Sequence, residues 1–312
     1  MTWTVIKRHG EKMTIYDYLI VGGGIAGSVC ARELGKRGKK CIILEKNSSQ
    51  SEKVCGGGVS YKALGMLEKT GIETESLFLT DSKRITGHII FQDGKYKEKI
   101  YEGGKISLGI RRALLDGCLI CAAKYYNVQI KYGEEVKNVF RTGELYEVNG
   151  FWAKEIVWAS GARSIFGETL NGQSIGLSGQ ITAKTDLEDN RFHYWYFEKQ
   201  NSEKYFWAFP VGNHLWNVGV WSRNFERRLK EDYQYCMEKF FLNRTIGEWG
   251  YLRKPRAEFL GHCDQRKEDC FRRSGIGDFA GTCNPVNGGG IHYAIKSAVE
   301  YAERQQEESF TP

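Results

Sequence analysis

Hydrophobic and polar residues follow two different rhythms along this chain. An apolar run over 16–21 is followed by a helical pattern from Ile25 onwards, and a second apolar run covers Cys41–Leu44. Runs of this kind are typical of parallel strands that are buried on both faces. Between Ser178 and Arg223, aromatic and polar residues instead alternate with period two. That alternation predicts the strands of an antiparallel sheet.

The same patterns predict the remaining elements. Asp93-Gly94, between two alternating runs, predicts a hairpin turn, and Gly71 is expected to end a short helix that starts at Tyr61. Further strands are expected at 128–130, 135–139, 145–148, 156–159, 191–197, 205–209 and 215–221. Helices are expected at 61–69, 112–123, 224–242 and from 291, the last with a buried face of Ile291, Ala294, Ile295, Ala298 and Val299.

Together these elements predict an α/β protein with two domains. A Rossmann-like nucleotide-binding domain, with a parallel sheet and a β-meander, is expected to comprise 14–84, 107–165 and 270–312. A substrate domain built on an antiparallel sheet is expected to be inserted at 85–106 and 166–269. Residues 1–13 lack the long apolar segment of a signal peptide and are expected to be a disordered extension.

Composition and charge narrow the class of protein. Hydrophobic residues make up 41% and charged residues 27% of the 312 residues, as in ordinary globular proteins. The formal charge of +7 is spread along the chain, so nucleic acid is not an expected partner. A basic face suits an acidic electron-transfer protein or a peripheral contact with an anionic membrane. Scattered cysteines without a secretion signal favour reduced thiols and a cytoplasmic location.

The first candidate for chemistry is the Gly-x-Gly-x-x-Gly motif between the first apolar run and its helix. Gly22 allows a tight turn, Gly24 lets a pyrophosphate approach the backbone, and Gly27 lets the helix pack close to the strand. Glu45 ends the second apolar run, at the spacing of an acidic residue that binds a ribose hydroxyl. The alternative is an ordinary glycine-rich turn without a ligand. The strand, helix and acidic residue around the motif favour a dinucleotide.

A second glycine-rich region near the other end of the chain indicates which dinucleotide. Asp278 follows Gly277 and can bind the ribityl hydroxyls of a flavin, although an aspartate there can also serve only as a turn or cap residue. The glycines of 284–290 precede the last helix and offer backbone N–H groups and a positive dipole end to a flavin ring. NAD needs no such second element. The sequence therefore predicts FAD.

Five stretches in this order resemble the geranylgeranyl reductase family of the glutathione-reductase-like, para-hydroxybenzoate-hydroxylase-like flavoproteins. They extend from residue 16 to about residue 300. The more specific ones are the Cys-Gly-Gly stretch and Tyr-x-Trp-x-Phe-Pro. The five stretches are Gly22–Gly27 with Glu45, Lys53–Gly58, Arg112-x-x-Leu115-Asp116-x-x-Leu119, Tyr205–Pro210, and Gly277-Asp278 through Asn284-Pro285 to Gly290-Ile291.

The resemblance implies a role for each site residue. Arg112 is expected near the FAD phosphates, Val136 near the adenine, and Cys55 facing the flavin, while Tyr205, Trp207 and Phe209 line the substrate cavity. The full set of implied FAD-binding residues is Gly22, Gly24, Ile25, Ala26, Gly27, Glu45, Lys46, Cys55, Gly56, Gly57, Arg112, Val136, Gly161, Gly277, Asp278, Pro285, Gly288, Gly289, Gly290 and Ile291. The sequence ends soon after the last helix, where many members of the family continue.

The activity implied by the resemblance is reduction of carbon–carbon double bonds, in an isoprenoid-like apolar substrate. Reduced flavin supplies a hydride, and the protein must exclude water and supply a proton. Cys55 can donate that proton, act as a redox thiol, or only fill space beside the flavin. With no second nucleotide motif, the electron donor is left open between NAD(P)H and a small protein such as reduced ferredoxin or flavodoxin.

Two other functions and one other kind of site are compatible with these residues. Trp207-Ala208-Phe209-Pro210 is similar to the halogenase Trp-x-Ile-Pro motif, so a flavin monooxygenase or halogenase is an alternative. An electron-transfer flavoprotein without a small substrate is another. Cys118 and Cys121 have redox or zinc spacing, but their helical pattern favours core packing. No regular spacing supports a metal site at His262, Cys263 and Cys270, and no metal is expected.

Overall fold

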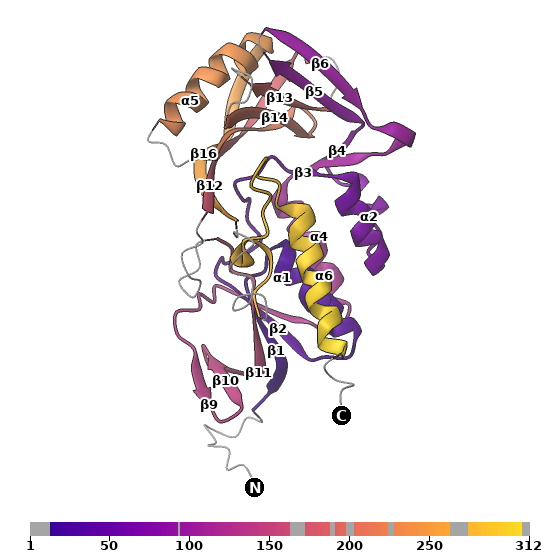
Figure 1. Ribbon diagram of the computed structural model, residues 1–312, viewed down its shortest axis with the longest axis vertical. Helices are drawn as coiled ribbons and strands as arrows, with labels where there is room; N and C mark the ends of the chain where they lie inside the picture. Colours follow the sequence, from indigo (N-terminus) through magenta and orange to yellow (C-terminus); the bar gives the residue numbers. More distant parts are fainter. Residues whose placement is uncertain are drawn as a thin grey trace.

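The computed structural model describes residues 13–92, 94–162, 172–187, 191–197, 203–223, 228–262 and 274–307. Among them are three sheets, of six, seven and three strands. The six-stranded and seven-stranded sheets lie toward opposite ends of an elongated molecule, with α6 (Ile291–Glu307) beside the region between them (Figure 1). Most of the predicted N-terminal extension, Asp93 of the predicted hairpin turn, and Cys263 and Cys270 lie outside the described residues, as does the side chain of His262.

The six-stranded sheet has the predicted parallel part and meander. Its parallel strands are buried because the runs that form them are almost wholly apolar, and helices α1 (Ile25–Lys36), α4 (Arg112–Lys124) and α6 share one core cluster with them. Its order is β8 (Gln129–Tyr132), β2 (Cys41–Glu45), β1 (Ile15–Val21), β11 (Phe151–Trp158), β10 (Leu145–Val148) and β9 (Phe140–Thr142). The prediction of a strand at 135–139 is wrong, because the meander begins only at β9.

The seven-stranded sheet contains the three predicted aromatic strands. Its order is β16 (Thr245–His262), β12 (Gly172–Thr185), β15 (Leu215–Ser222), β14 (Lys204–Gly212), β13 (Phe192–Phe197), β5 (Gly87–Gln92) and β6 (Lys95–Ile100). Neighbouring strands are antiparallel except β13 and β5, which are parallel. The three predicted aromatic strands are antiparallel to one another, as expected, and the parallel pair arises because a long connection returns the chain beside β5 in the same direction.

The two faces of this sheet have different partners. One face carries Phe206, Trp216 and other buried side chains that pack against α5 (Leu229–Cys236) and the turn that follows it. The register places Tyr205 opposite Trp221, Trp207 opposite Gly219, and Phe209 opposite Asn217. Directly paired residues share a face. This second face, which we call the aromatic face, is turned away from α5 and toward the glycine-rich loops.

The helix predicted at 224–242 is interrupted. Residues 224–227 lie outside the described part, α5 ends at Cys236, and a π-helical turn follows at Met237–Phe241. The wider turn directs both Phe240 and Phe241 into the core, where their exposed fractions are 1% and 0%. The helices at 61–69 and 112–123 are confirmed as α2 (Tyr61–Thr70) and α4.

A small sheet connects the two larger ones. It contains β3 (Gly58–Val59), β7 (Ser107–Ile110) and β4 (Ser82–Ile85), and the four-residue helix α3 (Glu75–Phe78) precedes β4. A methyl group at Gly109 of β7 would overlap the carbonyl oxygen of Pro210 in β14. The backbones of the small and large sheets are therefore in direct contact, and this contact fixes the glycine loop before β3 against the aromatic face.

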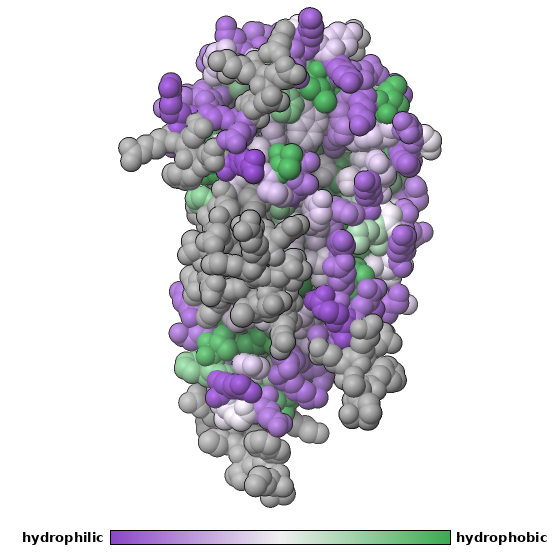
Figure 2. Space-filling model, in the orientation of Figure 1, coloured by the Kyte–Doolittle hydropathy of each residue, from purple (hydrophilic) through white to green (hydrophobic). Residues whose placement is uncertain are grey.

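Hydrophilic side chains predominate over the described surface in Figure 2, where hydrophobic ones form a few separate groups. The described helices include none whose length and apolar character would let it cross a bilayer.

Candidate functional site

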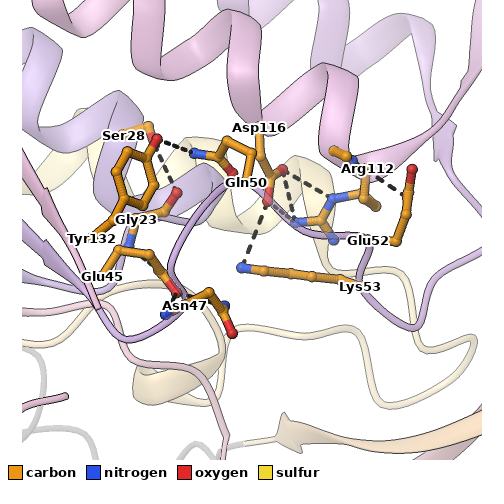
Figure 3. A network of polar contacts seen from close by, with 11 residues as sticks. Gly23, Ser28, Glu45, Asn47, Gln50, Glu52, Lys53, Arg112, Asp116 and Tyr132 are labelled. Atoms are coloured by element: carbon orange, nitrogen blue, oxygen red, sulfur yellow. Dashed lines mark hydrogen bonds and ion pairs between the residues drawn. The ribbon is translucent and has the colours of Figure 1, made fainter. Parts of the chain in front are cut away.

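The first glycine motif forms a tight turn between β1 and α1. Gly22 has a φ of +108°, which favours glycine, and a methyl group at Gly27 would overlap the carbonyl oxygen of Gly22. Glu45, at the end of β2, accepts a hydrogen bond from the Gly23 N–H at 2.8 Å through one carboxylate oxygen and from the Asn47 N–H at 3.0 Å through the other (Figure 3). The turn and the predicted acidic residue are thus in contact.

The N-terminal end of α1 is suited to an anion. Gly24 precedes the helix, and no side chain caps the first N–H groups. A methyl group built on Gly24 would meet, within 4 Å, only the ammonium end of Lys53, 2.6 Å from Nζ. Lys53 therefore adds a cation to the positive end of the helix dipole. The sequence prediction did not single out Lys53, although it lies in one of the matching stretches.

Arg112 and Lys53 converge on Asp116, a fully buried carboxylate. Arg112 donates from Nε to Oδ1 and from a terminal nitrogen to Oδ2, both at 3.1 Å, and Lys53 Nζ lies 3.6 Å from Oδ2 (Figure 3). Burial alone would lower the pKa of Arg112, but Asp116 and the nearby Cys55 sulfur raise it above its ordinary value. Lys53 thus lies beside both Gly24 and Asp116, so one cation of this group is positioned at the N-terminal end of α1.

The C-terminal glycine region lies against this first site. A methyl group built on Gly277 would lie 2.9 Å from the Cβ of Ala26, in the first turn of α1. The Gly277 N–H donates to Ser297 Oγ in α6 at 3.0 Å. Burial raises the pKa of Asp278 to about 6, against the opposing effect of Arg112 and Lys53. Two regions about 250 residues apart in the sequence therefore meet.

The loop before α6 is tightly bonded and touches the aromatic face. The Gly288 N–H donates to the Asn284 carbonyl at 2.9 Å, and Gly288 has a φ of +63°. A methyl group there would lie 2.6 Å from Trp221 Nε1. The Tyr205 hydroxyl donates to the Asn287 carbonyl at 2.6 Å. Tyr205, predicted as a substrate-lining residue, thus also holds this loop.

The Cys55–Gly58 loop packs directly on the same aromatic face. A methyl group on Gly56 would lie 2.6 Å from a ring carbon of Phe209, and one on Gly58 would lie 2.8 Å from His193. Asn217 donates to the Gly56 carbonyl at 3.2 Å. The Cys55 sulfur accepts from the Gly57 N–H at 3.3 Å. The glycines are therefore explained by close packing against aromatic rings and by the φ of +73° at Gly57.

The aromatic face forms one cluster with unsatisfied polar atoms at its surface. The Trp195 ring lies 4.9 Å from Tyr205 and 5.0 Å from Phe209, and the Tyr205 ring stacks 5.2 Å from Trp221. Trp207 Nε1 and Asn217 Oδ1 are buried without a hydrogen-bond partner in the part of the chain that the structure describes. Such atoms normally find a partner, so hydrogen-bonding capacity is left unused beneath the Gly56 backbone.

A family model described as FAD binding domain matches residues 16–303. The chain belongs to the FAD binding domain family. The predicted α/β flavoprotein fold is confirmed by this match and by the solved structures that resemble it. The protein is an FAD-dependent oxidoreductase.

Several relatives and solved structures match almost the whole chain. Menaquinone reductase of Mycolicibacterium smegmatis is 24% identical over 92% of this chain and 75% of its own. Digeranylgeranylglycerophospholipid reductase of Thermoplasma acidophilum is 25% identical over 95% and 79%. A geranylgeranyl bacteriochlorophyll reductase-like protein of T. acidophilum superposes with a TM-score of 0.78 at 22% identity, covering 96% and 81%. A myxobacterial chondrochloren halogenase gives 0.74 at 19%, covering 96% and 76%. The resemblance to geranylgeranyl reductases is thereby confirmed.

The residues of this flavoprotein fit FAD. The backbone at Gly24 is open to an anion except for a flexible ammonium group, and Glu45 lies at the turn in a position to meet a ribose. Trp207 Nε1 and Asn217 Oδ1 lack partners beside Gly56, so polar capacity is left over at this end of the site. FAD is a natural occupant of a site with a cationic end and an aromatic end.

For four other predicted FAD-binding residues, the structure shows burial or backbone conformation but no contact that indicates FAD. Val136 is buried in the core cluster behind β2, where the neighbouring Glu134 N–H donates to the Glu45 carbonyl at 2.9 Å. Gly161 follows β11 with a φ of +81°. Lys46 and Pro285 are exposed. Their contact with FAD stays a prediction.

The sequence predicts core packing for both cysteines of α4, and the structure shows it for one of them. Cys118 is partly buried and packs against the core cluster. Cys121 is exposed, so the expectation of core packing is wrong for it.

Proposed function

We propose that this flavoprotein reduces carbon–carbon double bonds in an isoprenoid chain. The observation that carries the proposal is the aromatic face of the seven-stranded sheet, held by Gly56–Gly58 and the 284–290 loop at the flavin end of the site. Relatives named digeranylgeranylglycerophospholipid reductase and menaquinone reductase support it, because both names denote reductases of molecules with polyprenyl chains.

The polar residues of the site are proposed to orient the cofactor. Lys53, Arg112 and the first N–H groups of α1 hold the pyrophosphate, because Lys53 and the helix end present positive charge beside Gly24 and Arg112 shares Asp116 with Lys53. Glu45 accepts from the adenosine ribose, and Asp278 accepts from the ribityl hydroxyls. Asp116 holds Arg112 in place through its two hydrogen bonds. Reduced FAD, when bound, supplies the hydride.

The aromatic residues are proposed to hold the alkene and keep water away. Trp207 and Phe209 have exposed fractions of 6% and 7% and face the Gly56 backbone. Because the Gly56 backbone already covers both rings, the alkene is proposed to lie at the margin of this cluster, beside the partly buried Trp195 and Tyr205. Exclusion of water by the surrounding rings protects the hydride. Tyr205 positions the 284–290 loop against this surface through its bond to Asn287.

Cys55 is the proposed proton donor. Its sulfur lies at the start of the glycine loop that touches Phe209, close enough to Arg112 to affect the pKa of that guanidinium. A thiol at this boundary between the cationic and aromatic ends can transfer a proton to the carbon that does not receive the hydride.

A single-turnover experiment tests the proposed reaction. FAD-loaded protein is reduced photochemically without oxygen and mixed with a digeranylgeranyl lipid, with menaquinone, or with buffer. The proposal predicts flavin reoxidation only with a polyprenyl substrate, and a product two hydrogens heavier by mass spectrometry that keeps both hydrogens after any quinol ring has been reoxidised in air. Reoxidation that requires oxygen and halide, with a halogenated product, would replace the proposal with the halogenase alternative. Reoxidation by an electron-carrier protein alone would support the electron-transfer alternative.

A further inference from the structure

Strand β16 exposes an unusual run of apolar side chains. Ile246, Trp249, Tyr251 and Leu252 have exposed fractions of 60%, 41%, 39% and 54%. They lie within seven consecutive residues, and the Trp249 and Tyr251 rings are in edge-on contact at 5.4 Å. β16 forms an edge of the seven-stranded sheet among the described strands. These four residues, which we call the apolar segment, are therefore accessible at this edge of the sheet.

Basic side chains follow the apolar segment directly. Arg253, Lys254 and Arg256 are all exposed. With Lys53 and Cys55, they also line a cleft between the 52–55 loop and the sheet. We call Arg253, Lys254 and Arg256 the basic segment. Of the strand's two acidic residues, Glu258 follows the basic segment and Glu248 lies within the apolar segment, between Ile246 and Trp249. The exposed edge thus has an apolar end and a cationic end, and the cationic end borders the site.

We propose that the apolar and basic segments of β16 dock the protein on an anionic lipid bilayer. Trp and Tyr side chains favour the boundary between headgroups and hydrocarbon, and exposed Ile and Leu gain by entering it. Arg and Lys side chains extend along the same boundary and bind anionic headgroups. The idea that the substrate comes from the membrane rests on the proposed function. The docking of β16 on the bilayer does not depend on that function.

The position of the cleft that the basic segment lines agrees with docking of β16 on a bilayer. The basic segment belongs both to the exposed edge and to the lining of this cleft, whose volume is about 30 Å³. A lipid held at β16 would therefore lie at the border of the site, although the cleft itself has room for only about one water molecule. An apolar chain would otherwise have to be transferred through solvent, at roughly 0.8 kcal/mol for each CH₂ exposed.

Strand pairing with a second copy of the chain is disfavoured by the edge itself. The register of β12 and β16 shifts between Gln180 and Ile181, leaving Leu252 as an extra residue in a bulge. Pro255 lacks an N–H to donate, and three cations surround it. Bulges, proline and positive charge are the devices that prevent edge-to-edge association.

Vesicle co-sedimentation tests the proposal with the FAD-loaded full chain. Vesicles of phosphatidylcholine alone are compared with vesicles that also contain phosphatidylglycerol. Arg253→Gln, Lys254→Gln and Arg256→Gln together should lower the partition coefficient on anionic vesicles on the order of 100-fold, since each cation contributes about fivefold. Trp249→Ala with Leu252→Ala should lower it by at least about tenfold, through lost apolar insertion.

Matched control variants remove lysine and exposed apolar side chains from parts of the surface outside β16. Lys95, Lys97 and Lys99, on the opposite edge strand β6, are changed to Gln together, and the exposed Leu79 and Phe140 are changed to Ala together. Both control variants should bind anionic vesicles within about threefold of the unchanged protein, because they lie outside the proposed surface. Thermal unfolding and FAD titration establish that every variant is folded.

Three results would overturn the docking proposal. One is equal loss of binding in the β6 and β16 charge variants, which would show attraction by net charge alone. Another is unchanged vesicle binding by the Trp249/Leu252 variant. The third is a dimer in vesicle-free sedimentation velocity that the same variant abolishes, which would make β16 a contact between copies. Failure of the reductase chemistry would instead leave vesicle binding intact.

Discussion

Replacing Gly24 with alanine separates FAD binding from folding. Gly24 has φ −78° and ψ −170°, an extended conformation that alanine adopts freely. The added methyl group meets only Lys53 Nζ, on a side chain that is 38% exposed and can move aside. A compatible Gly-to-Ala change stabilises by about 0.4–1 kcal/mol, and loss of a glycine N-cap offsets part of this. The unfolding free energy of the flavin-free protein should therefore change by less than about 1 kcal/mol.

The same methyl group occupies the place where the pyrophosphate is expected to approach the backbone. The Lys53 side chain can move away from the added methyl group. A pyrophosphate held by several backbone N–H groups can move away only by losing those hydrogen bonds. We expect FAD affinity to fall at least 10- to 100-fold, about 1.4–2.8 kcal/mol. Affinity is measured by flavin-fluorescence titration of deflavinated protein, and stability by urea unfolding without FAD.

Gly65→Ala is the matched control, because nothing lies within 4 Å of a methyl group built there in α2. It should raise stability by roughly 0.5–1 kcal/mol and leave FAD affinity unchanged. Wild-type FAD affinity in Gly24→Ala would refute the reasoning. So would an equal loss in Gly65→Ala.

The remaining predictions concern the charged and thiol groups of the site. Asp116→Ala leaves the Arg112 guanidinium without its buried partner and should lower the unfolding free energy by about 3–5 kcal/mol in urea; a loss below about 1 kcal/mol would contradict this. The folded-state pKa of Asp278, about 6 against an ordinary 3.8, means that flavin-free protein loses stability as pH rises through this interval. Asp278→Asn should therefore gain about 2 kcal/mol relative to wild type as pH rises from 4 to 6, and a pH-independent difference would exclude the effect. Cys55→Ser should lower the single-turnover rate by about 10²–10⁴-fold with FAD affinity unchanged, whereas a fully active Cys55→Ala would reduce Cys55 to a space-filling role.

Local signals made part of this site predictable from the sequence. The turn at Gly22–Gly27, the acid at Glu45 and the glycines of 284–290 each depend on neighbours within a few residues, so their backbone requirements are visible as residue types. The helix ending at Gly71 was predictable for the same reason, and its φ of +87° confirms it.

Contacts between distant segments were not predictable in this way. The Lys53–Asp116 ion pair and the Tyr205–Asn287 bond join residues far apart in the chain, and neither pattern nor spacing marks them. β16 was missed because an edge strand exposes both faces over much of its length, so its sequence lacks the alternation of a half-buried strand. The parallel pairing of β13 with β5 likewise depends on the path of the chain between them.

Equilibrium titration of the deflavinated full chain with FAD and with FMN tests the central claim most directly. If the Gly22–Gly27 turn and the Gly277–Ile291 region grip the two ends of one dinucleotide, FAD should bind at one site per chain. FMN, which lacks the adenosine half that Glu45 and Gly24 are proposed to hold, should bind at least about 100-fold more weakly. Absence of saturable FAD binding, or equal affinity for FMN, would contradict the account.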